Sequence, residues 1–130
     1  MNIKKPTTHI WIGAIICGLY VILGAFGAHG LKSSLSALQL NTYETALRYM
    51  IIHGLALMLT NLIYIVLEKY NRWTNYLIYL GLILFSASLI VHATKDLIGV
   101  NVDVFAFFAP FGGLCFVASW FIFAIKIKGK

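Results

Sequence analysis

The chain has 130 residues, of which 61% are hydrophobic and only 11% are charged, and its mean hydropathy is +0.88. Soluble domains carry about 25% charged residues, so the composition excludes an ordinary soluble protein and indicates one integral membrane domain, residues 1–130. The formal net charge of +6 does not indicate a nucleic-acid partner, because the cations lie outside the centres of the apolar runs, where they set topology and contact lipid headgroups.

Four apolar runs are each long enough to cross a bilayer as a helix, which takes about 20 residues. They predict an all-α fold, a polytopic bundle of four transmembrane helices spanning residues 10–28, 43–67, 73–93 and 104–125. The first run follows Lys4 and Lys5 and superficially resembles a signal peptide. Its length and the poor cleavage site after it predict a retained helix instead.

The polar connection after the first span, residues 30–42, contains leucines at helical spacing. Leu31, Leu35 and Leu38 share one face, which predicts a short helix lying in the membrane interface. Asn41 or Thr42 is expected to cap the second transmembrane helix, because these side chains accept hydrogen bonds from the first free backbone N–H groups.

The cations are distributed unevenly between the two sides of a four-span protein. The side with both termini holds Lys4, Lys5, Lys69, Arg72, Lys126, Lys128 and Lys130, against Lys32, Arg48 and Lys95 on the other side. The positive-inside rule therefore predicts that both termini lie in the cytoplasm.

Small residues and one proline interrupt the first and fourth runs. Ala14 and Gly18 form a small-xxx-small pair that lets another helix approach closely. The full set of predicted packing or kink positions is Gly18, Gly24, Gly27, Pro110, Gly112 and Gly113. Pro110 is expected to break or kink its helix.

Two charged residues open the second span. Glu44 and Arg48 are four residues apart, so they share a helix face and can pair. A structural ion pair that anchors the end of the helix is one interpretation. A binding site for an anionic headgroup or substrate is the other.

Deeper in the second span, His53 lies about 140° around the helix from Arg48, given about 100° per residue. It shares a stripe with Tyr49, Thr60 and Tyr64. Such a stripe should face other helices, where it makes interhelical hydrogen bonds, or a wetted cavity with a proton-linked role.

His29 ends the first span at a depth similar to that of Glu44, because both flank the same connection. We therefore expect a polar cluster of His29, Glu44, Arg48, Tyr49 and His53 at the non-cytoplasmic mouth of the bundle. The sequence has no catalytic motif, no cofactor motif and no HxxxH, HxH or CxxC spacing for a metal. We expect no catalytic residue, no cofactor and no bound metal.

Several segments together resemble one family. They are Gly24-Ala-Phe-Gly-Ala-His-Gly-Leu31, Tyr43-Glu-Thr-Ala-Leu-Arg-Tyr49, His53-Gly-Leu-Ala-Leu57, Leu84-Phe-Ser-Ala-Ser-Leu89 and Pro110-Phe-Gly-Gly-Leu114. In this order they resemble the domain-of-unknown-function 423 family of small bacterial inner-membrane proteins. The resemblance covers nearly the whole chain. It implies four membrane helices, an inner-membrane location and no assigned biochemical activity.

The function expected from the sequence is that of a non-enzymatic membrane protein: an accessory subunit, a membrane-integrity factor or a small oligomeric scaffold. Its partners would be membrane lipids and a second copy or a larger membrane complex. The alternative is a carrier or binding protein for a small solute or lipid, with the polar cluster as its pocket. A membrane enzyme is the third alternative.

Overall fold

The computed structural model describes residues 4–99 and 103–129, and within these stretches every regular element is a helix. In chain order the elements are α1 (Lys4–Phe26), the π-helix η1 (Gly27–Leu31), α2 (Ala37–Val66), α3 (Arg72–Gly81), the π-helix η2 (Leu82–Ala87), α4 (Ser88–Ala93), α5 (Lys95–Ile98) and α6 (Asp103–Lys128). Lys130, one of the cations counted for orientation, lies outside the described residues.

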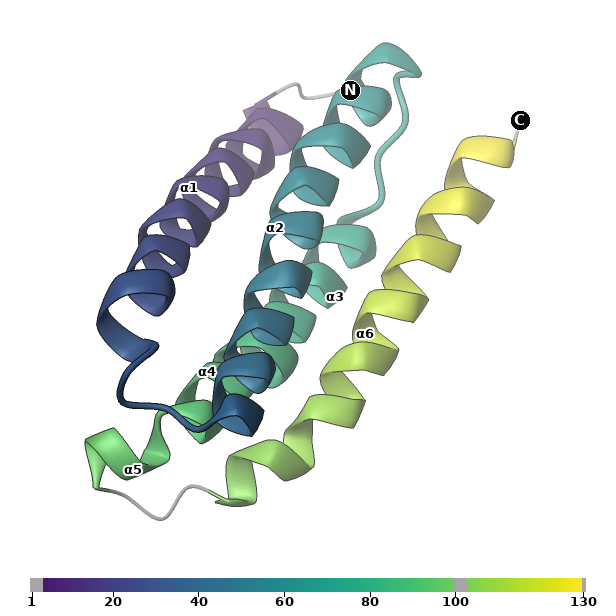
Figure 1. The fold of residues 1–130 in the computed structure, drawn as a ribbon. Helices are drawn as coiled ribbons and strands as arrows, with labels where there is room; N and C mark the ends of the chain where they lie inside the picture. Colours follow the sequence, from purple (N-terminus) through teal and green to yellow (C-terminus); the bar gives the residue numbers. More distant parts are fainter. Residues whose placement is uncertain (1–3, 100–102, 130) are drawn as a thin grey trace.

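These elements form four rods: α1 with η1 is the first, α2 the second, α3 with η2 and α4 the third, and α6 the fourth. The rods lie side by side, with both chain termini at one end and α5 at the other (Figure 1). Four helical stretches are long and apolar enough to cross a membrane: Lys5–Leu31, Ala37–Val66, Arg72–Ala93 and Val104–Lys128. The predicted all-α fold with four spans is therefore confirmed. The observed stretches begin up to six residues before the predicted ones.

The rods pack as two pairs. α1 packs on α2, while α6 packs on α3, η2 and α4; α2 also contacts η2 and α4 and so joins the pairs. Large apolar side chains such as Val21, Leu59 and Leu62 are exposed on the outside. In a membrane these side chains face lipid, which accounts for a surface that water would not tolerate.

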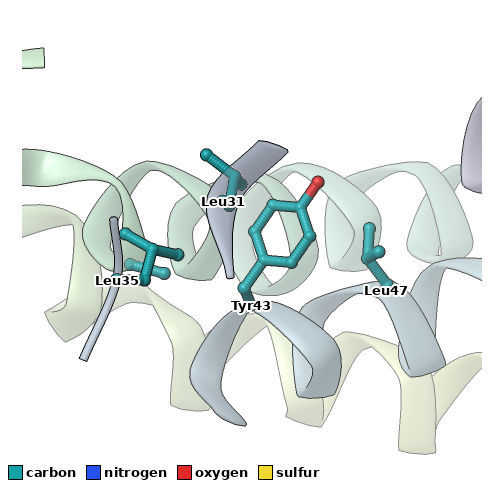
Figure 2. Packing of buried hydrophobic residues seen from close by; sticks show 5 residues of the cluster. Leu31, Leu35, Tyr43 and Leu47 are labelled. Carbon is teal, nitrogen blue, oxygen red and sulfur yellow. The ribbon is translucent and has the colours of Figure 1, made fainter. Parts of the chain in front are cut away.

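An apolar cluster near the α5 end holds the first three rods together. Its buried members are Leu31, Leu35, Tyr43, Leu47 and Ala93, four of which are labelled in Figure 2. The Tyr43 hydroxyl donates to the Leu23 carbonyl (2.7 Å). A Cβ added at Gly27 would lie 2.6 Å from the Tyr43 ring, so the packing against Tyr43 leaves no room for a side chain at this position.

The second transmembrane helix begins earlier than predicted, and its cap is Ser36 rather than Asn41 or Thr42. The Gln39 backbone N–H donates to Ser36 Oγ (3.2 Å), and the Ser36 N–H donates to Gln39 Oε1 (2.9 Å). This reciprocal capping box fixes the helix start. Residues 37–42 thus belong to α2, and the connection between the spans is a turn rather than a separate helix.

The close approach of α1 to α2 occurs at glycines other than those predicted. A Cβ added at Gly13 would lie 2.7 Å from the Gly54 carbonyl oxygen, and one at Gly54 would lie 3.0 Å from Ile16 Cγ2. At Gly18 and Gly24 an added Cβ would meet no atom within 4 Å. Within the described chain neither glycine makes a close contact, and Gly24 instead borders an open space between α1 and α2.

The fourth rod is continuous through Pro110, so the predicted break of the helix does not occur. The nearby Gly112 packs closely on the third rod, where an added Cβ would lie 2.5 Å from the Phe85 backbone nitrogen. Gly113 is less constrained, with the nearest atom at 3.9 Å. Of the predicted positions in this helix, Gly112 makes the closest contact.

Candidate functional site

A pocket of about 400 Å³ lies between the first rod and α2, toward the α5 end. Glu44 and Arg48 line it from α2, and Lys32 lines it from the turn after η1. All three charged side chains are exposed. The pocket was anticipated at Glu44 and Arg48, whereas Lys32 was counted only as a topology signal.

No ion pair joins Glu44 to Arg48 in the part of the chain that the structure describes. Both side chains instead turn toward the shared pocket, where the formal charges are two positive and one negative. The spacing of four residues places them on one helix face, as expected. The arrangement leaves the Arg48 guanidinium able to donate to a ligand, and a guanidinium binds carboxylate or phosphate in a bidentate manner.

His29 does not join this pocket. It lies in η1, its side chain is exposed, and the pocket is lined by its neighbours Gly27 and Ala28 instead. The matching depth predicted from the sequence is therefore not enough to bring His29 to Glu44. The turn between them directs Lys32 into the pocket in its place.

Tyr49 and His53 lie on the other side of α2, packed against η2 and α6. The His53 ring stacks on Phe116, with ring centroids 3.5 Å apart and planes 12° apart. Tyr49 contacts Phe85, with centroids 4.4 Å apart. The predicted cluster is thus divided: Glu44 and Arg48 lie on one face of α2, Tyr49 and His53 lie on another, and His29 joins neither group.

Both ring nitrogens of His53 have partners. Its Nδ1 lies 2.8 Å from the Tyr49 carbonyl oxygen, and the Trp120 indole N–H donates to its Nε2 at 3.4 Å. A carbonyl can only accept, so Nδ1 carries the proton and the imidazole is neutral in this arrangement. His53 is 3% exposed, which supports the interhelical interpretation over a wetted cavity.

A buried polar layer lies toward the end of the bundle that holds the termini; Tyr64 belongs to the predicted stripe, whereas Asn61, Thr74 and Asn75 were missed from the sequence. Asn61 of α2 and Asn75 of α3 each donate to the side-chain oxygen of the other (2.8 and 3.1 Å), and both are fully buried. The Tyr64 and Thr74 hydroxyls lie 2.7 Å apart, and Ser119 Oγ donates to the Thr74 carbonyl (2.8 Å). The sequence feature that could have predicted this layer is an asparagine within each of two apolar spans, because polar side chains in membrane helices pair across helices.

His9 forms a second contact that the sequence did not reveal. Its Nδ1 lies 2.6 Å from the Tyr79 hydroxyl, and its Nε2 lies 3.1 Å from the Tyr70 hydroxyl. These bonds join α1 to α3 through Tyr79 and to the connection before α3 through Tyr70, near the end with the termini. Both ring nitrogens are again occupied by protein groups.

Long polar side chains tie the ends of the rods. Gln39 Nε2 donates to Asp96 Oδ2 (2.6 Å) and so joins the start of α2 to α5. The Lys69 ammonium donates to the Ile127 carbonyl (3.0 Å) and to the Gly129 carbonyl at the C-terminal end of α6. A cation there also complements the helix dipole.

The described residues include two free thiols and no cluster of metal ligands. Within residues 4–99 and 103–129, no three His, Cys, Asp or Glu side chains are close enough together to hold a metal ion. Cys17 and Cys115 are free cysteines, on α1 and α6. Within the described residues, the geometry offers an anion-binding arrangement at one pocket and hydrogen bonds inside the bundle.

Four membrane-length helices, an apolar surface and a bundle joined by buried hydrogen bonds define a small multi-pass membrane protein. The chain belongs to the family described as "Protein of unknown function (DUF423)", whose model matches residues 23–113. The resemblance drawn from the sequence is thereby confirmed.

Two relatives illustrate the similarity. The chain is 34% identical over 117 residues to the UPF0382 membrane protein SH2409 of Staphylococcus haemolyticus, covering 90% of this chain and 92% of the relative. It is 35% identical over 124 residues to the UPF0382 inner membrane protein YgdD of Escherichia coli K12, covering 92% and 91%. No solved structure matches the chain.

Proposed function

We propose that this protein acts without catalysis, as a packed helix-bundle component of the inner membrane in an accessory, membrane-integrity or scaffold role. The observation that carries the proposal is the pairing of three polar side chains inside the bundle. His53, Asn61 and Asn75 are buried, and their hydrogen bonds run to other protein groups. A transport path needs polar groups that face water, and a catalytic site needs a nucleophile next to a base.

The inner membrane and an orientation with both termini in the cytoplasm are part of the proposal. The Escherichia coli relative is named an inner membrane protein. The uneven distribution of cations supports the orientation, because lysines and arginines accumulate on the cytoplasmic side of membrane proteins.

Thiol labelling in intact cells tests the packed interior and the orientation. The background is a variant in which Cys17 and Cys115 are replaced by alanine. Thr60→Cys and Ser119→Cys are close in size to the native residues at buried positions, so we expect them to remain unlabelled by a charged, membrane-impermeant maleimide. Ser34→Cys, on the exposed turn, should be labelled. Lys128→Cys should be labelled only after the membrane is opened.

Rapid labelling of Thr60→Cys or Ser119→Cys would reveal water inside the bundle and would contradict the packed-bundle role in favour of a carrier. Labelling of Lys128→Cys in sealed cells would reverse the proposed orientation. The two results are independent, because one reports on the interior and the other on an end of the chain.

A second candidate function is that of a binding protein for a small solute or lipid. The pocket bordered by Lys32, Glu44 and Arg48 favours it. Carriage across the membrane is less well supported, because Tyr49 and His53 do not continue that pocket inward. Binding of a ligand held at one end of the bundle is compatible with the packed interior.

A further inference from the structure

We propose that the pocket between the first rod and α2 binds the headgroup of an anionic phospholipid, with its phosphodiester between Lys32 and Arg48. The inference deepens the binding alternative given under the proposed function and does not depend on the packed-bundle role. It rests on the charges of the pocket, its depth in the membrane and the nature of its walls.

The charges of the pocket select the ligand. Lys32 and Arg48 present two cations to one space, and in the described chain neither is paired with Glu44. Arginine donates two parallel hydrogen bonds to phosphate oxygens, while lysine acts as a compact charge. The excess of one positive charge suits a headgroup with one negative charge. The Glu44 carboxylate suits hydroxyl donors on the same headgroup, as in phosphatidylglycerol.

The depth of the pocket matches the headgroup region. The third span, Arg72–Ala93, has 22 residues and a length of about 33 Å, close to the hydrocarbon core of about 30 Å. Ala93, at its α5 end, packs in one cluster with Tyr43. Glu44 therefore lies at the boundary of the hydrocarbon, and Arg48 about one helical turn deeper, within reach of a lipid phosphate.

The walls of the pocket suit a lipid rather than a free anion. Tyr20, Leu47 and Ile51 also line it and present aromatic and apolar carbon surface beside the charges. Gly24 contributes no side chain, and the space next to it is open, since an added Cβ would meet no atom within 4 Å. A glycerol backbone and the first carbons of an acyl chain fit against such a surface.

Native mass spectrometry of the full chain in mild detergent tests the proposal, with phosphatidylglycerol, phosphatidylethanolamine or phosphatidylcholine added singly. One phosphatidylglycerol should be retained per chain, and the other two lipids should bind more weakly. Arg48→Gln and Lys32→Gln should each raise the dissociation constant about 10- to 100-fold, because each removes a charged hydrogen-bond donor.

Matched variants separate the pocket from the general lipid surface. Gly24→Leu fills the open space and should abolish retention, whereas Gly18→Leu, at an equally open position outside the pocket, should not. Lys128→Gln removes one charge at the other end of the bundle and should also leave binding unchanged. Melting temperatures without added lipid identify any variant that has lost its fold.

Equal retention of phosphatidylglycerol by all variants would indicate unspecific lipid binding and would overturn the inference. Equal binding of phosphatidylcholine would overturn the charge argument. If soluble glycerol phosphate competed as well as the lipid, the site would be one for a free phosphate ester, and the lipid assignment would be wrong. None of these outcomes changes the thiol labelling of the interior, so the two proposals fail independently.

Discussion

At the scale of single residues, the paired amides of Asn61 and Asn75 join two helices by reciprocal hydrogen bonds. Each side chain satisfies the other in a site with no exposure to solvent. An amide left alone in such a site loses its hydrogen bonds without regaining water. The pair therefore acts as a specific clasp between α2 and α3.

Replacing Asn61 by alanine should lower the free energy of unfolding by about 1–2 kcal/mol, because Asn75 is then left unpaired. The double variant Asn61→Ala/Asn75→Ala should cost less than the sum of the single changes. Equilibrium unfolding in detergent measures both quantities. The control is Thr60→Ala, whose native hydroxyl bonds only to the Ala56 carbonyl of its own helix and should not couple to Asn75. Strict additivity of the two asparagine changes would contradict the clasp.

The angular positions of single residues on α2 also explain why the predicted cluster is divided. Arg48 and His53 are both on α2, but their positions around the helix axis differ by about 140°. Once one side of α2 faces the first rod, the other must face η2 and α6. The sequence analysis contained this angle, yet the choice of neighbour for each face required the packed structure.

At the scale of elements, the start of α2 depends on a short polar box rather than on the apolar run that follows. Ser36→Ala should lower stability by about 1 kcal/mol, since one end of the helix loses its cap. Thr42→Ala is the matched control: its hydroxyl only bonds back to the Leu38 carbonyl within α2, and the change should be close to neutral. Thermal melting in detergent compares the two. A larger effect at Thr42 than at Ser36 would restore the cap position first predicted.

The four spans were predictable because long apolar runs have few other solutions in a membrane. The helix start at Ala37 could have been predicted from Ser36 and Gln39, which have the spacing of a capping box. The π-helices η1 and η2 were not predictable, since no local pattern marks them. The packing glycines depend on how each helix is rotated, so Gly13 and Gly54 could not be distinguished from Gly18 and Gly24.

At the scale of the whole molecule, two helix pairs enclose a polar layer while their outer faces stay apolar. The charged groups of the pocket lie at one end, and the terminal lysines Lys126 and Lys128 lie at the other. Between these ends, His53 and Leu57 near the centre of α2 are buried, which supports a protein that is anchored by its ends and closed in its middle. The role we propose follows from that closed middle.

The most direct test of the closed bundle is a high-resolution crystal structure grown from bicelles that contain phosphatidylglycerol. The account predicts no ordered water beside His53, Asn61 or Asn75, whose hydrogen bonds should run to the protein partners described above. It also predicts a lipid phosphate between Lys32 and Arg48. A chain of ordered waters leading from the pocket to Asn61 would contradict the central claim and would identify the bundle as a conduit.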